Sequence, residues 1–233
     1  GFDKKYLFCD ELVIGAGPAG IQAAIEAAEA GDDVLLVDEN VFIGGSLNYA
    51  RTAVDGQPVR DRRTELVARA SKLPNLHIML ETTVNGCYAD NWVSLIQEKR
   101  MIKLRAKRVT LCSGVLEQPA LFHNNDLPGV MMGSGAQRLM RLYGVRPGKS
   151  AVVLAGNDDA YGVALDLLDA GIDVAAVVDL RSEISDDSRA VAVAEHGTTI
   201  MRSSTVFAAH GENNHLSAVE VRKVIAPGEC ARD

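Results

Sequence analysis

A glycine-rich turn near the start of the chain has the residue types and spacing to bind a phosphate. Residues 15–20 have the sequence GAGPAG, and they follow a short apolar run and precede an alanine-rich segment. Gly15 permits a tight turn, Gly17 leaves room for a phosphate, and Gly20 lets a helix pack closely against a strand. The free N–H groups at the start of that helix would bind the phosphate. Pro18 suits this first turn because no intrahelical hydrogen bond requires its N–H.

A carboxylate follows at the spacing that such a turn requires. Asp38 comes directly after the apolar run 34–37, and dinucleotide-binding folds carry an acidic residue about 20 positions after the turn to accept hydrogen bonds from ribose hydroxyls. Its negative charge would repel a 2′-phosphate, which disfavours NADP. The strand, turn, helix, strand and carboxylate together predict a Rossmann β-α-β unit that holds the ADP half of NAD or FAD.

Other candidate cofactor-binding residues follow predicted strands or a second glycine turn. Gly44, Gly45 and Ser46 could bring backbone close to the phosphates or to a ribityl chain, or form a plain loop. The pair at 113–114, after the strand predicted at 108–112, has the same two interpretations. The full set of predicted cofactor-binding residues is Gly15, Gly17, Pro18, Ala19, Gly20, Asp38, Glu39, Gly44, Gly45, Ser46, Val84, Ser113 and Gly114.

A second glycine turn, residues 156–162 (GNDDAYG), departs from the first. It also lies between an apolar run and a predicted helix, but Asp158 and Tyr161 stand where the second and third glycines would be. A carboxylate facing a pyrophosphate at low dielectric costs on the order of several kcal/mol. We therefore expect this turn to have lost dinucleotide binding, with a modified binding mode as the alternative.

The remaining pattern predicts two similar halves. Apolar runs predict strands at 11–14, 34–37, 76–80 and 108–112, helices at 18–30 and 60–72, and an antiparallel meander between 82 and 107. After an irregular crossover at 115–130, we predict helices at 134–143, 160–170 and 185–196 and strands at 151–155, 174–178, 199–202, 205–210 and 216–224. The fold class is α/β: two Rossmann-like units, 1–122 and 123–233, with parallel sheets and an antiparallel meander.

Composition narrows the class of protein. A content of 47% hydrophobic and 24% charged residues is typical of a soluble globular protein. No apolar run reaches the roughly 18 residues of a membrane span and no signal peptide opens the chain, so we expect a cytoplasmic protein. The basic cluster at 99–108 alternates with apolar residues, which indicates the solvated face of a strand and no nucleic-acid site. We expect neither nucleic acid nor membrane as a partner. Because the chain begins without Met, we expect it to be a piece of a longer protein.

The sequence contains no pattern for metal binding or for a catalytic disulfide. The four cysteines lie far apart, so we expect small buried apolar side chains in a reducing compartment. The five histidines are scattered, and Glu117 and Asp126 in the crossover either line a site or serve the fold. Catalytic residues stay unknown, and any redox chemistry would belong to the cofactor.

Four segments resemble the family of α subunits of heterotetrameric sarcosine oxidase, and parts of them resemble the α subunits of hydrogen cyanide synthase and of dye-linked proline or opine dehydrogenases. They are LVIGAGPAGIQAA, VLLVDENVFIGGSL, RAKRVTLCSGVLEQPALFHNNDLPGVM and YGVRPGKSAVVLAGNDDAYGVALDL. The resemblance implies an oxidoreductase subunit with NAD or FAD at residues 15–20. It also implies partner β and smaller subunits that together oxidise sarcosine, a small amine, to glycine and form peroxide. On this analogy the chain binds a nucleotide but is inactive alone.

Two other functions stay open. A self-standing FAD-dependent NAD(P)H oxidoreductase would need a working second glycine turn, which Asp158 and Tyr161 argue against. A non-catalytic NAD-binding assembly module would use the nucleotide only to stabilise its fold.

Overall fold

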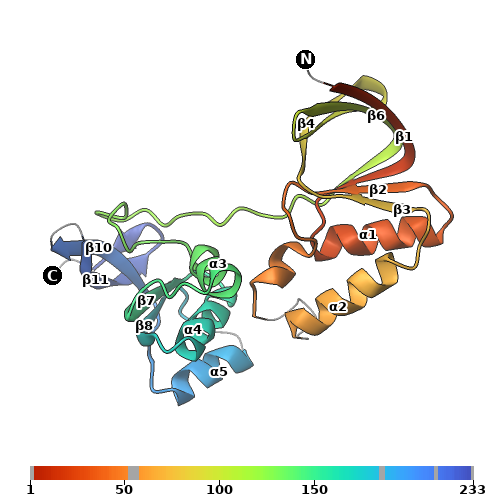
Figure 1. The fold of residues 1–233 in the computed structure, drawn as a ribbon. Helices are drawn as coiled ribbons and strands as arrows, with labels where there is room; N and C mark the ends of the chain where they lie inside the picture. The colour runs from red at the N-terminus through yellow and green to blue at the C-terminus, as the bar shows by residue number, and fades with distance from the viewer. Residues whose placement is uncertain (1–2, 52–57, 184–186, 213–214, 232–233) are drawn as a thin grey trace. The chain divides into compact units, whose positions relative to one another are not determined.

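The computed structural model describes residues 3–51, 58–183, 187–212 and 215–231 (Figure 1). The chain forms two compact units, one of Gly1–Asn48 with Thr52–Leu116 and one of Tyr49–Arg51 with Glu117–Asp233. The division after residue 116 comes a few residues before the boundary expected at 122. The start of the helix expected at 185 lies outside the described residues. No described helix is long and apolar enough to cross a membrane.

A six-stranded sheet forms the centre of the first unit, in the order β3-β2-β1-β6-β5-β4. Its strands are β1 (Asp3–Ile14), β2 (Val34–Val37), β3 (Leu76–Met79), β4 (Thr82–Tyr88), β5 (Trp92–Gln97) and β6 (Arg100–Leu111). Its helices are α1 (Pro18–Glu29), α2 (Val59–Ala70) and the short 3-10 helices η1 (Gly45–Asn48) and η2 (Ala89–Asn91). The pairs β1–β2, β2–β3 and β1–β6 are parallel, and β4, β5 and β6 form the predicted antiparallel meander.

Apolar layers cover both faces of the central strands. Val13 and Leu36 pack with Ile21 of α1 in one layer, whereas Leu12 and Val37 pack beneath the meander in the other. Burial on both faces explains why β2 has the uninterrupted sequence VLLV. The layers fix the carboxyl ends of β1 and β2 side by side, where the glycine turn and Asp38 follow.

Two strands are longer than the sequence pattern predicts. We expected β1 to begin at Glu11, but it begins at Asp3 and pairs with β6 along its length, from Asp3↔Arg100 to Ile14↔Leu111. The first residues of β1 are polar or exposed, so backbone pairing and not apolar burial places them. The meander strand and the strand expected at 108–112 are likewise one continuous β6.

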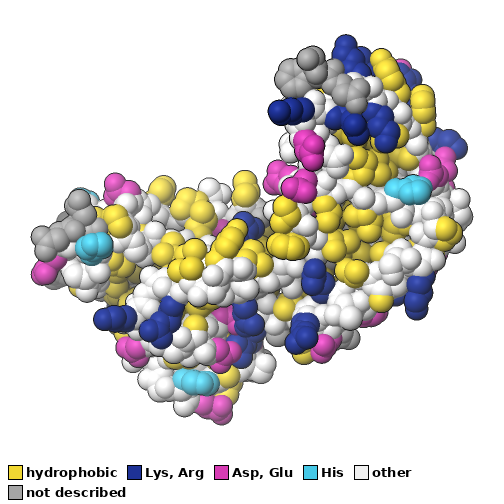
Figure 2. Space-filling view, viewed as in Figure 1, with side chains coloured by type: hydrophobic (Ala, Val, Ile, Leu, Met, Phe, Trp, Pro, Cys, Tyr) yellow, Lys and Arg dark blue, Asp and Glu magenta, His cyan; other side chains and the backbone are white. Residues whose placement is uncertain are grey.

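The basic cluster lies along β6, where buried and exposed side chains alternate as the sequence predicts. Ile102 and Leu104 are buried, while Arg105 and Lys107 are exposed. Near the grey N-terminal residues of Figure 2, Lys and Arg side chains lie beside hydrophobic ones on the surface of this unit.

The second unit has two three-stranded sheets. The parallel sheet consists of β7 (Ser150–Ala155), β8 (Asp173–Asp179) and β9 (Thr199–Met201), and the antiparallel sheet of β10 (Ser204–Glu212), β11 (His215–Ala226) and β12 (Glu229–Cys230). Its helices are α3 (Gly133–Tyr143), α4 (Asp159–Asp169) and α5 (Ser188–Glu195). The two-residue β12, which the sequence pattern did not predict, pairs with the end of β11.

The irregular crossover is held against the antiparallel sheet. His123 N donates to Phe207 O at 3.1 Å, and Ala209 N donates to His123 O at 2.9 Å. Asn124 Nδ2 donates to Ala209 O at 2.9 Å. His123 and Asn124 therefore anchor this segment on β10.

A buried carboxylate on α4 fixes the short segment 49–51 to the second unit. Asp166 Oδ1 accepts from Arg51 Nη1 at 3.1 Å and from Arg141 Nη2 at 2.6 Å. Its Oδ2 accepts from the buried Gln137 Nε2 at 2.8 Å. Arg51 also pairs with the exposed Asp169.

We predict that Asp166→Ala lowers the free energy of unfolding by about 1–3 kcal/mol, because the Gln137 amide is left buried without its acceptor. Asp169→Ala is the matched control. It removes an exposed partner of the same arginine and should cost less than about 1 kcal/mol. Urea unfolding followed by circular dichroism measures both, and equal costs would contradict this reading of the network.

Candidate dinucleotide-binding site

The turn between β1 and α1 is closed by backbone contacts that exclude side chains. Gly15 has a φ of 102° and donates its N–H to Val37 O at 2.8 Å. A Cβ on Gly15 would lie 2.2 Å from Cys112 O, and a Cβ on Gly20 would lie 1.7 Å from Gly15 O. These two glycines are therefore required by packing alone, whether or not a ligand binds.

Gly17 differs, because the protein itself leaves space around it. Its φ of −77° suits any residue, and a Cβ there would approach only Gly45 Cα, at 4.0 Å. Gly17 is the N-cap residue of α1, and no described side chain caps this helix end. Open space beside uncapped N–H groups is the geometry that a bound diphosphate needs.

The second glycine pair packs directly on the first turn. A Cβ on Gly45 would lie 2.7 Å from Gly17 Cα, and Gly44 N donates to Ala16 O at 2.8 Å. Asn48 Nδ2 donates to Gly45 O at 3.2 Å and steadies the loop. The structure thus brings two of the predicted motifs together without intervening side chains.

Asp38 lies at the same turn with its carboxylate directed to the backbone. Its Oδ2 accepts from Ala16 N at 2.6 Å, and its Oδ1 accepts from Asn40 N and Nδ2, both at 2.8 Å. A carboxylate oxygen can accept two hydrogen bonds, so Oδ2 keeps capacity for a ribose hydroxyl. Sequence analysis missed Asn40, although an amide two residues after a carboxylate is a known local pattern.

The remaining predicted cofactor-binding residues differ in how exposed their side chains are. Ala19, Glu39 and Ser46 are exposed, and Pro18 begins α1. Ser113 and Gly114 are exposed just beyond Cys112, and Gly114 has a φ of 75°. Val84 is half-buried in the apolar layer beneath the meander, although β4 begins beside Asp38, since Thr82 N donates to Asp38 O at 2.9 Å.

The cysteines have no redox partners among themselves. All four are free, and the expectation of burial is wrong for Cys87, which is exposed, while the other three are half-buried. Burial and then the charge of Asp33 raise the pKa of Cys9 to about 11, and burial raises the pKa of Cys112. Both thiols are therefore protonated at neutral pH and are weak nucleophiles.

Glu117 and Asp126 are the two acidic residues of the crossover that could line a site or serve the fold. Glu117 accepts from Gly133 N at 3.0 Å and Ser134 N at 2.9 Å, so it caps α3. Asp126 is exposed. Within the described residues, no group of three or more His, Cys, Asp or Glu side chains could hold a metal ion.

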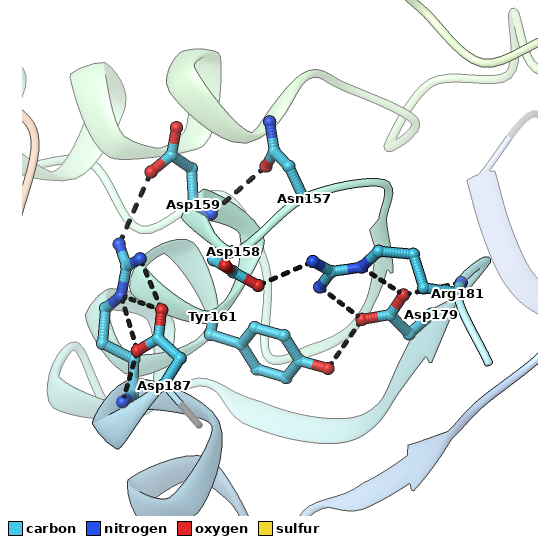
Figure 3. A network of polar contacts seen from close by, with 8 residues as sticks. Asn157, Asp158, Asp159, Tyr161, Asp179, Arg181 and Asp187 are labelled. Atoms are coloured by element: carbon cyan, nitrogen blue, oxygen red, sulfur yellow. Dashed lines mark hydrogen bonds and ion pairs between the residues drawn. The ribbon is translucent and has the colours of Figure 1, made fainter. Parts of the chain in front are cut away.

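Side chains fill the second glycine turn (Figure 3). Asp158 Oδ1 pairs with Arg181 Nη1 at 2.7 Å, and the fully buried Tyr161 donates its hydroxyl to Asp179 Oδ2 at 2.7 Å. Asp179 ends β8, with the same spacing from Gly156 as Asp38 has from Gly15. That spacing could have identified Asp179 from sequence, but the analysis did not use it.

The contacts in this cluster determine the protonation states of Asp179 and Tyr161. Burial alone would raise the pKa of Asp179, but the hydrogen bonds from Arg181 outweigh it and leave that pKa below its ordinary value. Burial, and then the bond to Asp179, raises the pKa of Tyr161. At neutral pH the carboxylate is therefore ionised and the phenol protonated.

Comparison with known proteins identifies related sequences. Residues 10–108 match a family described as FAD dependent oxidoreductase. Sarcosine oxidase subunit alpha of Corynebacterium sp. (strain P-1) is 36% identical over 96% of this chain, and that of Rhizobium meliloti (strain 1021) is 33% identical over 94%. The chain is a homologue of the sarcosine oxidase alpha subunits. It spans only 24% and 23% of the length of these two relatives.

Solved structures confirm the fold of this sarcosine oxidase homologue. The structure of L-proline dehydrogenase from P. horikoshii matches this chain with a TM-score of 0.70 and 26% sequence identity. The match covers 94% of this chain and 42% of that chain. T. acidophilum thioredoxin reductase has a TM-score of 0.74 at 16% identity, covering 96% of this chain and 73% of that one, which shows the fold alone. The predicted resemblance and the predicted α/β class are thus confirmed.

We predict that Gly20→Ala destabilises the sarcosine oxidase homologue by about 1–3 kcal/mol or more, because its Cβ overlaps Gly15 O and forces α1 away from the turn. Gly135→Ala in α3 is the control, since no atom lies within 4 Å of its Cβ, and it should stabilise by about 0.5–1 kcal/mol. Chemical unfolding measures both. A Gly20→Ala protein as stable as the native one would refute the packing role.

Proposed function

We propose that the first unit binds the ADP half of FAD or NAD, as the nucleotide-binding part of an oxidoreductase subunit of the sarcosine oxidase type. The observation that carries the proposal is the space at Gly17. The fold does not need a glycine there, yet Gly17 caps the N-terminus of α1, lies next to Gly45 and directly follows Ala16, whose N–H donates to the carboxylate of Asp38. A glycine without a packing role at such a place is explained by a ligand that approaches the backbone.

Each part of the ADP half has a matching group. The N–H groups of the first turn of α1 would bind the diphosphate, with Gly17 and Gly45 leaving the approach clear. Asp38 would accept from the ribose hydroxyls, held in place by Ala16 and Asn40. The exposed backbone at 113–114 lies at the end of the neighbouring strand. When bound, the dinucleotide supplies the redox chemistry, and the chain positions it.

The match of residues 10–108 to an FAD-dependent family supports FAD as the occupant. NAD stays the alternative, since both molecules share the ADP half that these residues contact. The negative charge of Asp38 disfavours the 2′-phosphate of NADP in either case.

The relatives of this chain are named as subunits of sarcosine oxidase. We propose that the whole protein oxidises sarcosine or a similar small amine together with β and smaller partner subunits. Within that assembly this chain contributes nucleotide binding. Alone it is expected to be inactive with the amine.

Gly17→Val is predicted to abolish binding of FAD and NAD while leaving the fold intact, because the side chain enters the space of the diphosphate and a Cβ at this position meets only Gly45 Cα, at 4.0 Å. Isothermal titration with each dinucleotide and thermal unfolding measure the two properties. Gly135→Val, in open space on α3, controls for the substitution. Unchanged affinity in Gly17→Val would show that the site lies elsewhere.

Asp38→Asn should weaken NAD or FAD binding about fivefold to tenfold, since a neutral acceptor replaces a charged one at the ribose. The ratio of NADP to NAD affinity should rise, because the repulsion of the 2′-phosphate is removed. Asp61→Asn removes the same charge from an exposed position of α2 and should change neither value. Titrations with NAD and NADP decide this, and an unaltered ratio in Asp38→Asn would exclude the ribose contact.

A further inference from the structure

The second unit keeps the backbone plan of a nucleotide-binding turn but fills it with its own side chains. Gly156 follows β7, α4 begins shortly after, and Asp179 ends the next strand, β8. In the first unit Gly15 follows β1, α1 begins shortly after, and Asp38 comes directly after the next strand, β2. The two turns can therefore be compared contact by contact.

At the start of α4, protein groups already occupy the place of a diphosphate. Asn157 Oδ1 accepts from Asp159 N at 3.2 Å, whereas no described side chain caps α1. The N-cap residue is Asp158, whose carboxylate is held by Arg181 at 2.7 Å. An incoming diphosphate would meet a bound N–H and a fixed negative charge.

At the end of β8, the carboxylate that would bind a ribose has no free acceptor position. The side chain of Asp179 is 0% exposed. Its Oδ1 accepts from Arg181 N at 2.9 Å and Nε at 3.0 Å, and its Oδ2 from Arg181 Nη2 at 2.8 Å and from Tyr161 at 2.7 Å. Two bonds to each oxygen exhaust its lone pairs. Asp38, by contrast, is half-exposed and accepts three bonds.

Tyr161 and Arg181 tie these two places into one cluster (Figure 3). The phenol ring extends from the first turn of α4 to Asp179, and the guanidinium of Arg181 joins Asp179 to Asp158. A ribose could reach Asp179 only by displacing both groups. That displacement would strip a buried carboxylate of its counter-ion, which is strongly unfavourable.

We propose that the second unit is a self-occupied nucleotide fold, in which Asn157, Asp158, Tyr161 and Arg181 make the contacts that a dinucleotide would otherwise make. Arg181 is the residue on which this self-occupied state depends most, because it pairs with both carboxylates at once. The second unit then binds no dinucleotide, and a nicotinamide cofactor cannot deliver hydride through it. This inference goes beyond the proposed function and does not depend on it.

Amide NMR of the ¹⁵N-labelled chain, titrated separately with FAD, NAD and NADP, tests the proposal directly. Signals of residues 156–162 should stay in place at saturating concentrations, in the native protein and in Gly17→Val. Saturable shifts of these signals in Gly17→Val, with one equivalent bound, would overturn it. A native protein whose signals at 15–20 also stay in place would refute the proposed function but leave this inference supported.

A second experiment addresses Arg181 itself. Arg181→Ala should lower the midpoint of thermal unfolding, and guanidinium ion at low millimolar concentration should restore part of the loss by refilling the place between the carboxylates. Arg146→Ala, at an exposed arginine of the same unit, should show neither effect. An Arg181→Ala protein with the native midpoint, or one that guanidinium does not stabilise, would contradict the role assigned to Arg181.

Discussion

Two backbone contacts, Gly20 against Gly15 and Gly15 against Cys112, set the distance between α1 and the sheet. No side chain fits at either glycine, so the helix begins directly above the carboxyl ends of β1 and β6. This closeness brings the N-terminal N–H groups of α1, the Gly44–Gly45 loop and Asp38 to one place. Every contact proposed for a dinucleotide depends on it.

The two glycine turns show how one backbone plan can lead to opposite results. In the first, the position of the second glycine is open and its carboxylate keeps acceptor capacity. In the second, that position carries Asp158, and an arginine and a tyrosine satisfy the carboxylate that ends the strand. Burial of an ionised group requires such compensation. A chain that supplies the compensation itself has no further need of a ligand there.

Sequence patterns predicted the elements that apolar burial determines, such as the uninterrupted β2, the buried α4 and the alternating meander. They failed where backbone pairing alone decides, as for the polar first residues of β1, which are held by β6. Within the candidate site, the glycines and Asp38 could be predicted from the sequence, because their spacing from the first two strands is itself the signal. Asn40 and Arg181 were not identified, since their roles come from contacts with a carboxylate that has to be placed first.

The central claim is that the first turn holds the half shared by FAD and NAD. Competition calorimetry with ADP alone measures this most directly, because ADP is the half that FAD and NAD share, with neither a flavin nor a nicotinamide attached. The account predicts that ADP binds with one site per chain and displaces whichever dinucleotide the protein binds. Dinucleotide binding that saturating ADP leaves unchanged would contradict it.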